Sequence, residues 1–221
     1  MTNTRLISDI FPYLIYIWHI GYKIMYISRY SRMDTTIRPG SFLSVVYVSD
    51  GEGDGLDIEE VSSKIRADID SIDGVAVTSE ETDPLAIKDL FRLLKRLKLP
   101  GRDLLLITDG NEYSDLDDLV GAGYVNYVNL KVDGPLDKSQ TECVKILDNC
   151  GCPYMVTATL IPGRISESAL KELASAIPGS KHLILKVGKS ADPTRKLDQK
   201  ELTSLANSVR GAAKDVRLVT Q

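Results

Sequence analysis

Cysteine and histidine are scarce in this chain, with three cysteines and two histidines among 221 residues. A low, odd number of cysteines without secretory spacing excludes a disulfide-built extracellular domain and favours a reducing, cytoplasmic location. The cysteines follow a C-x6-C-x-C pattern at Cys143, Cys150 and Cys152. We expect Cys143 to pack against a sheet and the other two to flank a turn. His19 lies in an atypical N-terminal stretch and His182 begins a predicted strand, so we expect no Cys-His metal site.

The chain also lacks an excess of positive charge and the short motifs of common enzyme classes. Its formal net charge is −4, and no basic stripe alternates with aromatic residues, so we expect no nucleic-acid binding. No Walker-type glycine-rich loop and no Ser-His-Asp arrangement can be assembled. We therefore assign no catalytic residues.

The first 32 residues differ in composition from the remainder. They contain half of the ten tyrosines and the only tryptophan, and residues 10–22 carry no formal charge. A signal peptide is not expected, because a small-residue cleavage site is missing. A membrane helix would be short, with Pro12 and His19 inside it and Lys23 at its end. We expect residues 1–32 to be an upstream or poorly ordered extension before Met33. The alternative is an amphipathic anchor within residues 6–28 for a membrane or a partner.

From residue 42 the chain alternates regularly between predicted strands and helices. Six strand-loop-helix repeats are expected, with strands at 42–48, 74–79, 103–108, 125–133, 153–161 and 182–187, and a terminal strand at 216–219. Asp57, Asp83, Ser114, Asp137 and Asp198 are the expected helix starts. Such repeats predict an α/β fold with a parallel sheet, either doubly wound or a barrel, in one domain spanning residues 33–221.

The stretch 125–137, VNYVNLKVDGPLD, carries an unusual pattern for a buried parallel strand. Asn129, Lys131 and Asp133 fall on one face, because side chains alternate along a strand. Strands of helix-covered parallel sheets are usually apolar on both faces. The polar row therefore predicts a face that lines a ligand cleft, with a solvent-exposed edge strand as the alternative.

Several segments in order resemble the radical S-adenosylmethionine (SAM) superfamily, in particular the activating proteins for pyruvate formate-lyase and anaerobic ribonucleotide reductase. TTIRPGSFLSVVYV resembles the entry to the first strand, GVAVTSEETDP the Gly-Gly-Glu-Pro strand, and LLLITDG the Thr-Asn-Gly strand. VNYVNLKVDGPLD is similar to the Asp-x-Lys strand, and PYMVTATLIPG to the Val-Pro-Gly strand end. The resemblance implies a partial (β/α)6 TIM-like barrel with its site at the carboxyl ends of the strands.

The chain departs from that family at its cofactor site. The family's C-x-x-x-C-x-x-C loop is replaced by SDGEGDGL, which has no cysteine, and carboxylates do not replace thiolates on iron. Glu80 and Glu81 stand where the family has its Gly-Gly pair. The family's Asp-x-Lys is inverted here as Lys131–Val132–Asp133, and Ile107 stands where the family has an aspartate. We therefore expect no iron–sulfur cluster and no required cofactor, although SAM binding stays open.

Acidic residues gather instead at the expected carboxyl edge of the sheet. They are Asp50, Glu52, Asp54, Glu80, Glu81, Asp83, Asp109 and Glu112. Such a cluster could hold a hard metal ion or dock a basic partner segment. The simpler interpretation is a helix cap at Asp83 and solvated loop residues elsewhere, and we favour it over a metal site. We expect Lys131 and Asp133 to pair with each other or with a neighbour, because unpaired buried charge is costly.

Three functional hypotheses follow from the resemblance and its departures. The first is a non-catalytic accessory or regulatory subunit of an anaerobic enzyme or its maturation complex, which binds a protein partner through the acidic edge. The second is an enzyme that binds SAM or another nucleotide without a cluster, perhaps a transferase. The third is an activating enzyme whose cluster ligands come from another subunit.

Overall fold

The computed structural model describes residues 25–51, 53–162, 165–188, 197–211 and 213–219. Eight strands form one sheet in the order of the chain: β1 Met25–Asp34, β2 Leu43–Asp50, β3 Gly74–Thr78, β4 Asp103–Thr108, β5 Tyr127–Val132, β6 Tyr154–Leu160, β7 Leu183–Val187 and β8 Val216–Val219. The connections contain α2 Ile58–Ala67, the 3-10 helix η1 Pro84–Ala86, α3 Leu90–Leu97, α4 Tyr113–Gly121, α5 Lys138–Cys150, α6 Glu167–Ala176 and α7 Gln199–Val209.

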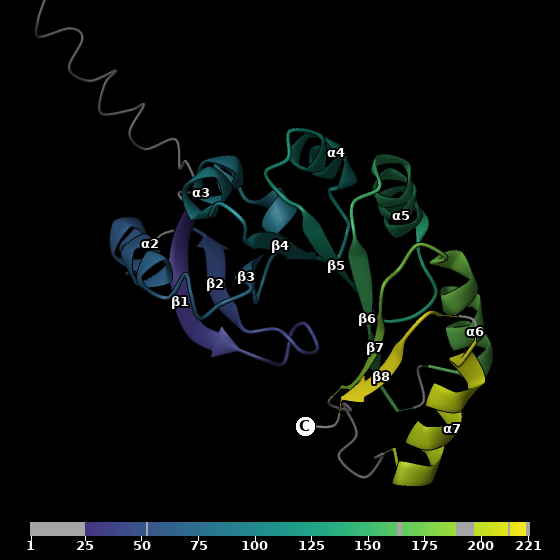
Figure 1. The fold of residues 1–221 in the computed structure, drawn as a ribbon. Helices are drawn as coiled ribbons and strands as arrows, with labels where there is room; N and C mark the ends of the chain where they lie inside the picture. The colour runs from purple at the N-terminus through teal and green to yellow at the C-terminus, as the bar shows by residue number, and fades with distance from the viewer. Residues whose placement is uncertain (1–24, 52, 163–164, 189–196, 212, 220–221) are drawn as a thin grey trace, which may run out of the picture.

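Strands β2 to β8 are all parallel, and each of β2 to β7 is followed by a helix. The predicted set of six β/α units in a partial barrel is therefore confirmed, and β8 adds a seventh parallel strand. Figure 1 shows the helices on the convex side of the curved sheet, with β1 and β8 at its two ends. Because the end strands do not pair with each other, the barrel is open.

Two apolar layers result from the alternation of side chains along the strands. The larger one lies between the sheet and the helices, and includes Val46, Leu106 and Leu130. The smaller one fills the concave side, and consists of Leu43, Val45, Ala76, Leu105, Ile107, Tyr127, Met155 and Ile184. The side chains of this inner layer fill the middle of the half-barrel, and space remains toward its two ends.

Strand β1 corrects the domain boundary expected at residue 33. It pairs antiparallel with β2 from Met25 opposite Asp50 to Asp34 opposite Leu43, and Ile27 is fully buried. Residues 25–32 therefore belong to the folded domain. Two register shifts interrupt the alternation of the strand, which removes the period-two signal from the sequence. The suggested anchor at 6–28 lies largely outside the described residues, and its last four residues are strand.

The helix expected from Asp83 through Leu97 is also different in the structure. Asp83 caps only η1, and Ile87 is extended (φ −86°, ψ 120°). Asp89 then adopts a left-handed conformation (φ 65°) directly before α3. Asp57, Asp137 and Asp198 cap their helices as expected, with complete capping boxes at Asp137 and Asp198. The helix start expected at Ser114 is wrong, because α4 begins at Tyr113 after Glu112, which makes no side-chain cap hydrogen bond. Within the described part of the chain, no helix has the length and apolar character needed to cross a bilayer.

Candidate functional site

A cavity of about 580 Å³ opens on the concave side of the sheet, toward the carboxyl ends of the strands. Neighbouring strands contribute its polar wall, because the inward positions of β3, β5, β6 and β7 carry threonine, asparagine and lysine. The lining residues are Thr36, Ile37, Tyr47, Thr78, Ile107, Asn129, Lys131, Thr157, Thr159, Ile184, Lys186, Val187, Gly188 and Val219. The wall therefore combines two ammonium groups, an amide and several hydroxyls with an apolar floor.

The structure places Asn129 and Lys131 of the expected polar row in this wall, but not Asp133. Asn129 is 4% exposed, and its Oδ1 accepts a 2.9 Å hydrogen bond from the Thr157 hydroxyl. Asp133 follows the end of β5 and is exposed. The expectation that Lys131 pairs with Asp133 is wrong, because no ion pair joins them within the described chain. The alternative of a neighbouring acid agrees with the effect of Lys131 on the pKa of Asp109. The cavity wall therefore carries two lysine side chains, one of them close to a carboxyl group.

Asp83 is a buried structural carboxylate rather than a rim residue. Its Oδ1 accepts hydrogen bonds from the Leu85 amide (3.1 Å) and the Thr108 hydroxyl (2.8 Å). Its Oδ2 accepts from the same hydroxyl (2.7 Å) and from the Gly110 amide (3.1 Å). These bonds join the loop after β3 to the end of β4, and they satisfy a carboxylate that water hardly reaches.

Asp109 lies half-buried beside this carboxylate at the end of β4. Burial, and next the neighbouring Asp83, raise the pKa of Asp109 to about 6. The Asn111 amide and the charge of Lys131 act in the opposite direction. At neutral pH, two carboxylates and one lysine therefore share this corner of the barrel mouth.

The other acids of the expected cluster do not converge on one point. Glu80 forms a 2.5 Å ion pair with Arg29, whose guanidinium stacks 3.6 Å above the Tyr47 ring. Asp50 accepts a hydrogen bond from Thr82 (3.3 Å). Besides Glu80, four acids at the carboxyl edge are exposed, and we call them the acidic rim: Asp54, Glu81, Glu112 and Asp133. Glu52 lies outside the described residues.

The loop that follows β2 is folded against strand β1. The Leu56 amide donates to the Ile27 carbonyl (2.8 Å), and the side chain of Tyr26 covers the glycines. A Cβ on Gly55 would lie 2.7 Å from the Tyr26 Cβ, and one on Gly53 would lie 2.6 Å from its Cζ. Close packing therefore requires glycine at position 55, whereas a side chain at position 53 would only displace the end of the Tyr26 ring.

The resemblance of the sequence to radical SAM proteins implies a cluster held by cysteines of the loop after β2, and this loop contains none. Cys143 lies in α5 and is fully buried, Cys152 is 8% exposed, and of the three only Cys150 is exposed. Cys152 lies just before the start of β6, at the opposite end of the parallel strands from that loop. Burial raises the pKa of Cys143 and of Cys152 to about 12, so both stay protonated. No group of three or more His, Cys, Asp or Glu residues in the described ranges could hold a metal ion. These residues do not fit a cluster.

Several residues of the wall were missed by sequence reasoning. The missed residues occupy inward positions of strands whose sequences are otherwise apolar, and they are Tyr47, Thr78, Thr157 and Thr159. In β6 the two threonines are two positions apart, and this alternation could have indicated a polar face. The Arg29–Glu80 pair was not predictable, because Arg29 lies in a strand that had been assigned to the extension. Lys186 of β7 also lies in the wall.

The pKa of Asp109 predicts a pH-dependent effect of Asp109→Asn. An unfolded aspartate titrates near about 3.9. Between that pH and about 6, the folded wild type retains a proton that the unfolded chain loses, so this group's contribution to stability falls as the pH rises. The asparagine variant does not titrate, so its free energy of unfolding relative to that of the wild type should increase as the pH rises. The increase should reach at most about 1 kcal/mol, because solvent screens a half-exposed group.

Urea unfolding at pH 4 and pH 7.5 measures this difference. Asp133→Asn removes the same charge from an exposed site and should show no such trend. A difference between Asp109→Asn and wild type that stays constant with pH would contradict the assignment.

Comparisons with known proteins were informative at the level of structure. No protein-family model matches the chain, and no curated protein sequence matches it. The structure is similar to Streptococcus suis SuiB bound to S-adenosylmethionine, at 14% identity and a TM-score of 0.59 over 77% of this chain and 44% of SuiB. SuiB bound to the precursor peptide SuiA matches at 13% identity and a TM-score of 0.61, over 90% and 47% of the two chains.

This chain thus spans less than half the length of SuiB. At such low identity, the similarity concerns the fold alone. The protein has an α/β fold similar to that of SuiB, with a largely parallel eight-stranded sheet covered by helices.

Proposed function

We propose that this protein is a radical-SAM-fold protein without a [4Fe–4S] cluster that acts as a non-catalytic accessory or regulatory subunit of an anaerobic enzyme or its maturation complex. The observation that carries the proposal is the loop after β2, which packs its glycines on Tyr26 and contains no cysteine. Thiolates are the ligands that such clusters need.

The acidic rim supports binding of a basic partner segment. Its four carboxylates follow four successive strands, β2 to β5, so they lie along one edge of the sheet. Within the described chain, none of the four forms an ion pair. Exposed charge of one sign steers and orients an oppositely charged partner. The SuiB complex with its precursor peptide supports the view that this fold accommodates a protein-derived ligand.

Anaerobic reconstitution with iron and sulfide tests whether a cluster can form. We expect sub-stoichiometric iron and no cluster absorption in the visible region. Cys150→Ser removes the exposed thiol, and any adventitious iron bound there should disappear with it. Stoichiometric iron and sulfide that persist in this variant would overturn the proposal.

Charge reversal on the rim tests the accessory role. Glu81→Lys combined with Asp54→Lys should abolish recovery of a native partner by affinity capture at low salt, because the attraction becomes repulsion. Glu172→Lys places a new cation on the exposed face of α6 and should leave recovery unchanged. Recovery of a free monomer from wild-type cells, or equal capture by all variants, would contradict the role.

The cavity favours a second candidate function, a cluster-independent enzyme that binds SAM or another nucleotide. Lys131 and Lys186 can bind an anionic group, and Asn129 with the threonine hydroxyls can bind sugar or amino acid groups. The SAM-bound structure of SuiB supports SAM as the first ligand to examine.

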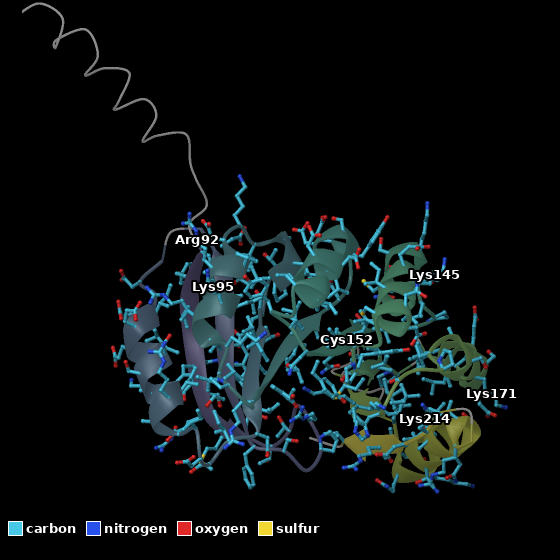
Figure 2. All side chains as sticks on the ribbon, turned by 45° about the horizontal axis from the view of Figure 1, so that its top comes forward. Arg92, Lys95, Lys145, Cys152, Lys171 and Lys214 are labelled. Atoms are coloured by element: carbon cyan, nitrogen blue, oxygen red, sulfur yellow. The ribbon has the colours of Figure 1, made fainter. Side chains whose placement is uncertain are left out.

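Calorimetric titration with SAM tests this second candidate. If SAM binds in the cavity, Lys131→Ala should weaken binding by about tenfold or more, the effect of one lost hydrogen bond to a charged group. Lys171→Ala is the matched control, because Lys171 projects from α6 to solvent, as Figure 2 shows. Absence of binding, or equal binding by both variants, would remove the support for this candidate.

A further inference from the structure

A second pocket lies at the opposite end of the half-barrel, where the parallel strands begin. Its volume is about 450 Å³, and it is separated from the cavity by the inner apolar layer. The lining comes from the β1–β2 connection, the starts of β4 and β5, and the segment before β7. These residues are Arg38, Pro39, Ser41, Asp103, Asn126, Tyr127, Pro153, Lys181 and His182.

Arg38 supplies a buried guanidinium to this base pocket. Only 10% of its side chain is exposed. Its Nε donates to the Ser41 hydroxyl (2.9 Å), and Nη1 donates to Asp103 (2.5 Å). The guanidinium also lies 5.0 Å from the centre of the Tyr127 ring. Because a guanidinium has five N–H donors, three of them have no acceptor among the described residues.

Tyr127 adds an independent sign that a ligand atom belongs here. The residue is 8% exposed, and its buried hydroxyl has no hydrogen-bond partner in the described chain. Burial raises the pKa of Tyr127, so the hydroxyl keeps its proton and remains a donor. A buried polar group without a partner is destabilising, so such groups are normally satisfied by protein, water or ligand.

The remaining polar groups leave the pocket richer in donors than in acceptors. Lys181 is exposed at the edge and forms no ion pair within the described ranges. Asp103 is the only carboxylate in the lining, and it already accepts from Arg38 and from the Asn126 amide (3.2 Å). The His182 ring is held by Asp215 through Nδ1 (2.8 Å). Arg38 neutralises Asp103, and Lys181 leaves a net positive charge.

We propose that this base pocket is a binding site for a phosphate-sized oxyanion, with Arg38 and Lys181 supplying charge and the Tyr127 hydroxyl supplying a directed hydrogen bond. An oxyanion has several acceptor lone pairs and no need of a donor partner, and guanidinium groups match its geometry. Free phosphate and the phosphoryl group of a small metabolite both present these oxygens, so both match the site. The site is separate from the cavity and from the acidic rim.

Titration of the full chain with inorganic phosphate tests the site, and methyl phosphate tests the phosphoryl group of a monoester. We expect saturable 1:1 binding and a phosphate-dependent rise in melting temperature. Tyr127→Phe should weaken binding by about fivefold to tenfold, the effect of one hydrogen bond. Without phosphate, the same variant should melt at or above the wild-type temperature, because it removes an unsatisfied hydroxyl. Lys181→Gln should also weaken binding.

A matched control separates this site from general attraction of anions. Lys171→Gln removes a cation from the outer face of α6 and should bind phosphate as the wild type does. Arg38→Lys should lower affinity; if it fails to fold, the isosteric Tyr127→Phe variant still decides the test. Failure to saturate, or equal weakening by Lys171→Gln and Tyr127→Phe, would overturn the proposal.

Discussion

The carboxyl edge of this half-barrel depends on one buried carboxylate. Asp83 accepts hydrogen bonds from the Leu85 amide, the Thr108 hydroxyl and the Gly110 amide, so it ties the loop after β3 to the end of β4. These hydrogen bonds fix the Asp83 carboxyl group in place beside Asp109. Burial first, and Asp83 next, raise the pKa of Asp109, while the charge of Lys131 acts in the opposite direction.

The curvature of the sheet explains why binding groups gather at two separate ends. Inward side chains in the middle of the strands are apolar and fill the concave side, whereas the inward positions near both strand ends are polar. Strand pairing does not close the ends of a barrel, so loops and side chains cover them instead. The cavity and the base pocket are therefore consequences of one architecture, and each has its own set of cations.

Much of the fold was predictable because helix caps and apolar periods are local signals. The strands β2 to β8 and the inward positions of Asn129 and Lys131 follow directly from alternation. Strand β1 was not predictable, because its two register shifts break that alternation. Its composition, rich in tyrosine and arginine, also matched the assignment of these residues to an N-terminal extension. The burial of Asp83 also depends on donors that are distant in the sequence, Thr108 and Gly110, and no local pattern reveals them.

Strand β1 gives a physical reason for a glycine in the loop after β2. Because β1 runs back along β2, Tyr26 lies where that loop must pass, and Gly55 has no room for a Cβ beside the Tyr26 Cβ. A cysteine at this glycine would require backbone movement in β1, and not only rotation of a ring. The loop after β2 therefore serves as a packing element of the sheet edge, and its glycine at position 55 follows from the position of β1.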